Sequence, residues 1–407
     1  MQLRVERHII TKNHPRWNEL DNLCFLSKNL YNAGLYKIKQ EFEKSGKWLR
    51  YNQLEKLIKE EKNPDFYALP SHEAQPILMQ LDKNMKGFFN SLRAWKKDKT
   101  RFVGCPAPPK YKHKIKGRNI IISSYAESRI NNRDGLIHYP KKSGLSHLKS
   151  YRATKENYKQ TRIVPQSSCY VIEVVYEVES QNLNLNKERK ISIDLGVNNL
   201  CAIISNQPDL KPLLINGKPL KSMNQYYNKE KAKFQSLLSQ GEFISKRIKK
   251  LELKRFNKIS NYLHHVSKLI INYCIENNIG TIIIGKNDGW KQNINLGSQN
   301  NQNFTYIPFN NLIHQLRYKG EFIGIEVIGN EESYTSKVSA LDLESIEFHE
   351  SYLGKREKRG LFKISCGSKI NADVNGSLNI MRKVVGDGFV NLLNKGCVLQ
   401  PLLVTPI

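Results

Sequence analysis

Ile191–Asn199, with the sequence Ile-Ser-Ile-Asp-Leu-Gly-Val-Asn-Asn, is the segment that sets the fold class of this chain. Its first residues alternate apolar and polar side chains and are rich in β-branched residues, a pattern that predicts a β-strand. Asp194 falls near the carboxyl end of that strand, where a buried carboxylate is costly unless it is paired or holds a metal. Gly196 lets a backbone or a substrate come close to this carboxylate. A metal site here requires further acids from neighbouring strands.

The composition indicates a globular protein with a polyanionic partner. The 407 residues are enough for two or three domains, and their formal net charge of +28 favours nucleic acid as the partner. Ribosomal or membrane-surface binding would also explain such a charge. The chain contains no apolar run near the roughly 20 residues of a membrane span, and Met1–His8 is charged where a secretion signal is apolar. The scattered cysteines include no CxxC pair, so we expect a cytoplasmic protein without disulfides.

The first half of the chain predicts a small OB-like β-barrel that is interrupted by helices. Residues 1–16 supply its first strand, at Gln2–Ile10. Residues 17–112 carry apolar side chains at helical spacing and end in a proline-rich basic linker, so they form a helical recognition insertion. Residues 113–186 contain short strands and turn signals that complete the barrel, or wedge. The expected strands are Ile120–Ile122, Ile137–Tyr139, Arg162–Val164 and Cys169–Val178.

Residues 187–384 predict an RNase H-like α/β domain, in which a mixed sheet and one helix gather carboxylates, and 385–407 form a tail without a predicted role. Such a fold hydrolyses phosphodiesters with two divalent cations about 4 Å apart, and hard carboxylate oxygens suit Mg²⁺. The predicted order is a strand with Asp194, a hairpin strand at 200–204, helices over 222–278, a strand ending at Gly285, a helix, a strand at 323–328 before Glu331 and Glu332, and a helix that carries Asp373 near its start.

A run of positive charge lies on the helices that follow the hairpin, with Glu252 as the one acid among seven basic residues. A solvated helix face is the alternative, but this density favours contact with phosphates. We also assign two lysines of the proline-rich linker to nucleic-acid binding. The candidate residues are Lys246, Arg247, Lys249, Lys250, Lys254, Arg255 and Lys258, with Lys110 and Lys112 in the linker.

The two acidic motifs resemble those of the TnpB family, which are insertion-sequence-encoded relatives of the type V CRISPR effectors. The segment around Asp194 resembles the first RuvC motif, and Asn371–Gly376 resembles the third, Asp-Arg-Asp-x-Asn-Ala. The linker sequence CPAPPKYK, Cys105–Lys112, is similar to the family's Pro-Arg-Phe-Lys. The resemblance covers about residues 1–385.

This resemblance implies an RNA-guided DNA endonuclease of a transposable element, which cuts beside a short target-adjacent motif by two-metal RuvC hydrolysis. The implied partners are a guide RNA derived from the element end and target double-stranded DNA, and the implied cofactor is Mg²⁺. The implied location is a prokaryotic cytoplasm, with nucleoid association when DNA is bound. Asp194 and Asp373 are then the first and third catalytic, metal-binding acids.

The second acid departs from the family pattern, because Gly285 stands where a glutamate is expected. A subset of the family is similar in having a relocated glutamate just before a Thr-Ser pair. Glu332, followed by Ser-Tyr-Thr-Ser, is therefore our candidate for the catalytic and metal-binding residue, with Glu331 as the alternative. Asp288 is a third option.

The zinc ribbon of the family is degenerate here, as an insert at about residues 335–370. Lys337–Ala340 stands where one CxxC pair is expected, and Cys366 is the single cysteine that remains. One thiol cannot build a structural zinc site, so we predict no zinc and a small buried role for Cys366. Ala372 replaces the arginine of the third motif, so any substrate contact from that position is lost.

Three other functions compete with the nuclease. A nuclease-deficient RNA-guided DNA-binding protein, acting as a repressor or a transposition accessory factor, would retain the fold without a third metal ligand. An actin-like or sugar-kinase ATPase also opens with Asp-Leu-Gly, but its second phosphate loop is absent from the sequence. Transposition catalysed by the chain itself cannot be separated from hydrolysis by acids alone.

Overall fold

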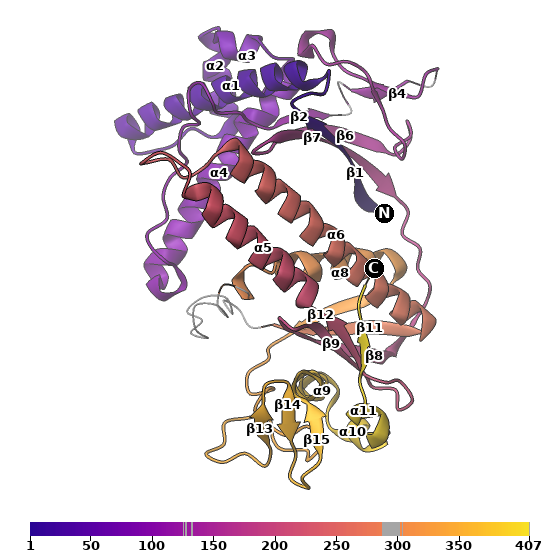
Figure 1. Cartoon of the computed structure of the whole chain (residues 1–407). Coiled ribbons are helices and arrows are strands. Elements are labelled where there is room, and N and C mark those ends of the chain that lie inside the picture. The colour runs from indigo at the N-terminus through magenta and orange to yellow at the C-terminus, as the bar shows by residue number, and fades with distance from the viewer. Residues whose placement is uncertain (125, 127, 132, 287–301, 303, 407) are drawn as a thin grey trace. The chain divides into compact units, whose positions relative to one another are not determined.

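The computed structural model of the chain describes every residue except 125, 127, 132, 287–301, 303 and 407. Within the described residues, the chain divides into two compact units, residues 1–179 and 180–407 (Figure 1). Among the helices that the structure describes, none combines the length and the apolar character needed to cross a membrane.

The first unit has a helical half, as the apolar spacing predicts. Its two long helices are α1 (Trp17–Ser45) and α4 (Ser71–Lys97). They approach closely at Gly34, because a Cβ there would lie 2.7 Å from Leu81 Cδ1. The shorter elements are α2 (Tyr51–Glu60), α3 (Pro64–Tyr67) and two 3₁₀ turns at Lys99–Arg101 and Lys141–Ser143.

The other half of the first unit consists of antiparallel strands. β1 (Gln2–Thr11) pairs with β7 (Cys169–Val178), so the N-terminal strand does join the strands that follow the helices. β6 (Tyr158–Pro165) and β2 (Ile121–Ser124) complete a sheet of order β1-β7-β6-β2. A separate three-stranded sheet consists of β3 (Arg129–Ile130), β4 (Leu136–His138) and β5 (Leu148–Lys149).

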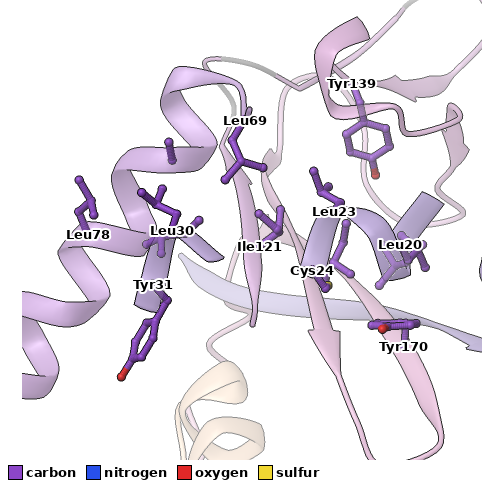
Figure 2. Close-up of a cluster of buried hydrophobic side chains, with 14 of the residues drawn as sticks. Leu20, Leu23, Cys24, Leu30, Tyr31, Leu69, Leu78, Ile121, Tyr139 and Tyr170 are labelled. Carbon is purple, nitrogen blue, oxygen red and sulfur yellow. The ribbon is translucent and has the colours of Figure 1, made fainter. Parts of the chain in front are cut away.

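The predicted OB-like barrel is not confirmed, because hydrogen bonds in the described part of this unit join its strands into two separate sheets. One hydrophobic core lies between the strands and the helices. Figure 2 shows Leu20 and Leu23 of α1 beside Ile121 of β2 and Tyr170 of β7. The alternation of β7 thus directs one row of side chains toward the helices.

Six strands build the mixed sheet of the second unit: β8 (Asn186–Leu195), β9 (Asn199–Ser205), β10 (Leu213–Asn216), β11 (Ile279–Gly285), β12 (Glu326–Asn330) and β16 (Leu402–Val404). Their order is β12-β11-β8-β9-β10-β16. β8, which carries Asp194, forms an antiparallel hairpin with β9, and β11 and β12 continue the sheet in parallel. The hairpin of β8 and β9 and the mixed strand directions agree with the predicted α/β nuclease fold.

Helices cover both faces of this sheet (Figure 1). α6 (Lys246–Glu276) and α8 (Phe309–Ile323) pack on the face that carries Ile282 of β11, whereas α9 (Ala372–Val385) packs on the face of the neighbouring Ile283. Successive side chains of one strand meet opposite layers because a strand has a period of two. This unit also contains α5 (Lys218–Gln235), α10 (Gly388–Leu392) and α11 (Lys395–Leu399).

Two segments lie outside this plan. A three-stranded antiparallel sheet precedes α9, and residues 385–407, for which we predicted only a tail, include β16, which pairs in parallel with β10. A strand of three residues carries too few side chains to show an alternating pattern in sequence. The strands of the small sheet are β13 (Lys355–Lys358), β14 (Leu361–Lys363) and β15 (Lys369–Asn371).

Candidate metal centre at the strand ends

The carboxyl ends of three parallel strands meet at one edge of the mixed sheet. Ile193 of β8 lies beside Ile284 of β11, and Ile284 lies beside Gly329 of β12. Asp194 is the next residue of β8, and Glu332 follows the end of β12 by two residues. In open α/β sheets, this edge is where ligands bind.

Asp373 reaches the same edge from the helical layer. The Oδ1 atom of Asn371 accepts hydrogen bonds from the backbone N–H groups of Asp373 (2.9 Å) and Val374 (3.2 Å). This cap starts α9 at the predicted position. Asp373 Oδ2 accepts a hydrogen bond of 2.8 Å from Asn199 Nδ2 at the start of β9. Asn199 thus orients the third acid, a role that its place in the first motif did not indicate.

Asp194 is half-buried among other acids. Burial raises the pKa of Asp194 to about 8, together with the carboxylates of Asp373 and Glu332. The positive charge of Arg356 acts in the opposite direction. Gly376 of α9 permits this proximity, because a Cβ there would lie 2.7 Å from Asp194 Oδ2. The three acids therefore form one electrostatic site.

The two adjacent glutamates after β12 point in different directions. Glu332 is half-buried, and its Oε2 lies 3.0 Å from the position that a Cβ on Gly285 would take. Burial raises the pKa of Glu332. Glu331 is exposed and pairs with Lys383 at 2.9 Å, and this hydrogen-bonded lysine lowers the pKa of Glu331. Glu332 therefore fills the space that a side chain on Gly285 would enter, whereas Glu331 is directed away.

Arg356 is the charged residue near Asp194 that our sequence reasoning missed. It belongs to the basic run Lys355–Arg359, and that run between the second and third acids was the available signal. Arg356 also borders a hollow of about 430 Å³. Asp288, our third option for the second acid, lies outside the described residues. The hollow is lined by Ser336, Lys337, Tyr352, Gly354, Lys355, Arg356 and Phe362.

The donor chemistry of the three acids fits a hard divalent cation. Two carboxylates from separate elements, those of Asp373 and Glu332, act on Asp194, and a bound cation would offset the repulsion that helps to raise its pKa. Within the described residues, however, no group of three or more His, Cys, Asp or Glu side chains is already arranged to hold an ion. The three acids therefore interact electrostatically, but within the described residues their side chains are not positioned as a preformed set of metal ligands.

Two carboxylates hold separate segments of the insert before α9 together by accepting hydrogen bonds from both. Asp342 accepts hydrogen bonds from Ser339 Oγ (2.6 Å) and from Ser365 N (2.9 Å) and Oγ (2.5 Å). Glu344 accepts from Ser339 N (2.6 Å) and Leu353 N (2.7 Å). Ser339 lies within Lys337–Ala340, where the resemblance places one cysteine pair of a zinc ribbon, and Ser365 directly precedes Cys366. We call the hydrogen-bonded group of Ser339, Asp342, Glu344, Leu353 and Ser365 the Asp342 joint.

Cys366 corrects one expectation, since it is exposed rather than buried. Its Sγ lies 3.3 Å from Ser368 Oγ, on a turn where Gly367 adopts a φ of +86°. Phe362 and Ile370 fill the core beneath this sheet, so the turn is left at the surface. The absence of zinc remains a prediction.

The predicted nucleic-acid-binding residues differ in their surroundings. Five of the α6 residues are exposed and Lys249 is half-buried, whereas Arg255 is held inside by hydrogen bonds to Asn224 Oδ1 (2.7 Å) and Tyr306 O (3.2 Å). In the linker, Lys110 is exposed. Lys112 is half-buried over the ring of Tyr31, and burial lowers its pKa. The exposed α6 residues are Lys246, Arg247, Lys250, Lys254 and Lys258.

Comparison with known families matches both halves of the second unit. The family OrfB_IS605, described as a probable transposase, matches residues 173–291. The family described as Cas12f1-like, TNB domain, matches residues 309–380. The first match contains Asp194, and the second contains Glu332 and Asp373.

Two individual proteins are similar to this chain. The TnpB-like protein ORF457 of Acidianus two-tailed virus is 29% identical over 206 residues, which are 48% of this chain and 42% of that protein. The chain thus matches less than half of that relative's length. A cryo-EM structure of a Cas12f1–sgRNA–target DNA complex aligns with 89% of this chain and 81% of its own, at 15% identity and a TM-score of 0.56. This structural similarity supports the fold.

Proposed function

This chain belongs to the TnpB family, and from that premise we propose that it is an RNA-guided DNA endonuclease of a mobile element. The convergence of Asp194, Glu332 and Asp373 at one sheet edge carries the proposal, because phosphodiester hydrolysis in RNase H-like folds needs acids at these places. The proposed partners are a guide RNA from the element end and a double-stranded DNA target beside a short adjacent motif. Base pairing with the guide would then supply the sequence specificity.

The three acids would hold Mg²⁺ through their carboxylate oxygens. When bound, a pair of divalent cations supplies an activated water and stabilises the leaving oxygen of the phosphodiester. Asn199 fixes one oxygen of Asp373, so that acid presents a constant orientation. Arg356 adds a positive charge beside Asp194, where the phosphate of a bound strand would bring further negative charge.

A cleavage assay with paired glutamate variants tests the proposal. The full-length protein, its cognate RNA and a target plasmid are incubated with Mg²⁺, and nicked and linear products are measured. We expect Glu332→Ala to lower the cleavage rate at least about 100-fold, because it removes one of the three carboxylates proposed to bind the metal. The adjacent Glu331→Ala, whose carboxylate faces Lys383, should cut like the wild type.

The same assay separates the proposal from its competitors. Equal cleavage by Glu332→Ala and the wild type would refute the assignment of Glu332. Target binding without any nick by the wild type would instead support a nuclease-deficient DNA-binding protein. Contact with phosphates through the basic residues predicts that affinity for duplex DNA falls by about 0.9 log units per contact for each tenfold rise in salt.

A further inference from the structure

A groove of about 280 Å³ runs between α5 and α6, and its lining includes none of the strand-end acids. The volume lies just below the roughly 300–1,000 Å³ of sites for drug-sized molecules, so it suits one flat ring system. The lining combines apolar and aromatic side chains with three basic ones. The residues are Ser222, Met223, Tyr226, Tyr227, Leu251, Lys254, Arg255 and Lys258.

One wall of the groove is held in place before any ligand arrives. The guanidinium of Arg255 lies over the rings of Tyr227 (4.9 Å to the centroid) and Tyr306 (5.0 Å). Its Nε donates a 2.7 Å hydrogen bond to Asn224 Oδ1. Asn224 and Tyr227 are themselves buried. The guanidinium of this stack is planar and positively charged, and its fixed position lowers the ordering entropy that is lost when a ligand binds.

The outer rim of the groove is free to contact a ligand. Tyr226 has 60% of its surface exposed, and Lys254 and Lys258 are also exposed. Across the described chain, these three side chains make no hydrogen bond or ion pair. The lysines are four residues apart on α6, so both head groups project from the same face. An aromatic ring thus lies beside two available cations.

We propose that this groove binds one unstacked base of a single-stranded nucleic acid. Tyr226 would stack on the base, and Lys254 and Lys258 would contact the flanking phosphates, as in sequence-independent single-strand binding. The inference deepens the proposed function, on which its biological meaning rests. A nucleic acid is favoured over a peptide because the chain's net charge is +28 and the rim is basic.

Oligonucleotide binding by the full-length protein, without divalent cations, tests this assignment. The probe is a short single-stranded oligodeoxyadenylate with one 2-aminopurine, measured by fluorescence anisotropy and by quenching. We expect Tyr226→Ala to weaken binding about tenfold and to abolish the quenching that stacking causes. Tyr226→Phe, which retains the ring, should behave like the wild type. Lys254→Gln and Lys258→Gln should each lower the salt slope by about 0.7.

Matched variants keep the result specific to the groove. Tyr67→Ala removes a tyrosine of similar exposure from the other unit, and Lys229→Gln removes a charge from α5 outside the groove. Both should retain the stacking signal. Wild-type affinity and quenching in Tyr226→Ala would overturn the assignment, as would equal binding of an oligonucleotide that is abasic at the probe position. Neither outcome touches the nuclease proposal, which is measured by plasmid cleavage.

Discussion

Asp194 and Asp342 lie in the same unit, yet their carboxylates meet opposite surroundings. Asp194 faces other acids, and burial together with Asp373 and Glu332 raises its pKa to about 8. Burial would raise the pKa of Asp342 too, but hydrogen bonds from Ser339 and Ser365 outweigh it and lower that pKa. A carboxylate supplied with donors connects segments of a fold, whereas carboxylates gathered against one another are stabilised by a cation.

The two regions are nevertheless coupled through α9. Asn375 Oδ1 accepts a hydrogen bond of 3.0 Å from Ala340 N, and its Nδ2 donates to Val338 O at 2.9 Å. Asn379 Nδ2 also donates to Val338 O at 2.9 Å. Hydrogen bonds therefore connect α9, which carries Asp373, to residues 338–340, which include Ser339 of the Asp342 joint. The joint supports the geometry of the strand-end acids without contributing a ligand.

Replacing Asp194 should give the largest effect on cleavage. It should also show that the Asp194 carboxylate is needed for cleavage but destabilises the fold. We expect Asp194→Asn to reduce plasmid cleavage by at least about 10³-fold. Without divalent cations, the same change should raise the unfolding temperature, because it removes a charge from among like charges. The raised pKa means that this charge destabilises the fold increasingly from about pH 4 to about pH 8. Thermal unfolding should therefore show a larger gain at pH 8 than at pH 4.

The control for this prediction is a metal titration. Added Mg²⁺ should stabilise the wild type and leave Asp194→Asn nearly unchanged, since a ligand stabilises only the state that binds it. A lower unfolding temperature for Asp194→Asn in the absence of metal would contradict the repulsion that distinguishes this site from the Asp342 joint.

Replacing Arg356 tests whether its positive charge, which comes from the insert, supports cleavage at the strand-end acids. Arg356→Gln should lower the cleavage rate about 100-fold, because no other residue that we identified acts on Asp194 with positive charge. Lys358 is exposed on the same strand, as Arg356 is, but it does not act on Asp194, so Lys358→Gln removes an equal charge and should have little effect. Cleavage kinetics under single-turnover conditions measure both variants. Equal losses would indicate a general effect of net charge.

Gly285 should show a smaller effect that depends on crowding. A Cβ at this position would lie 2.4 Å from Ile380 Cδ1 and 3.0 Å from Glu332 Oε2. Gly285→Ala should therefore destabilise the fold by about 1–3 kcal/mol and reduce cleavage about tenfold by displacing Glu332. Adding Ile380→Val removes the closest atom, so it should recover stability while cleavage stays low. Denaturant unfolding and cleavage rates distinguish the two effects.

The part of the site that sequence predicts is the part with strong local periodicity. The alternation before Asp194 and the cap at Asn371 specify a strand and a helix start within a few residues. The different surroundings of Glu331 and Glu332 are another matter, because they depend on Lys383, which pairs with Glu331 from 52 residues further along the chain. Single-sequence patterns carry no information about such pairs.

The surroundings of single side chains were also beyond local reasoning. Arg255 belongs to the same basic run as the exposed lysines of α6, but the ring of Tyr306, 51 residues later, stacks on it and the backbone oxygen of Tyr306 accepts its hydrogen bond. The position of Cys366 on a turn depends on what fills the core below it, and β16 pairs with β10 from almost 190 residues further along the chain. Each of these depends on tertiary contacts.

Asp342→Asn should give the smallest change in activity and the opposite stability change to Asp194→Asn. The amide can no longer accept from both serines as the carboxylate does, so the insert should lose about 1–3 kcal/mol of local stability. Because the pKa of Asp342 is lowered in the fold, its contribution is complete above about pH 4 and is lost as the pH falls through that lower value. Hydrogen exchange of residues 338–344 and 364–368 should accelerate in acid in the wild type, and already at neutral pH in the variant. Unchanged exchange would show that the carboxylate does not hold the two segments together. One zinc ion bound per chain in the purified protein would contradict the Asp342 joint and indicate a zinc site there.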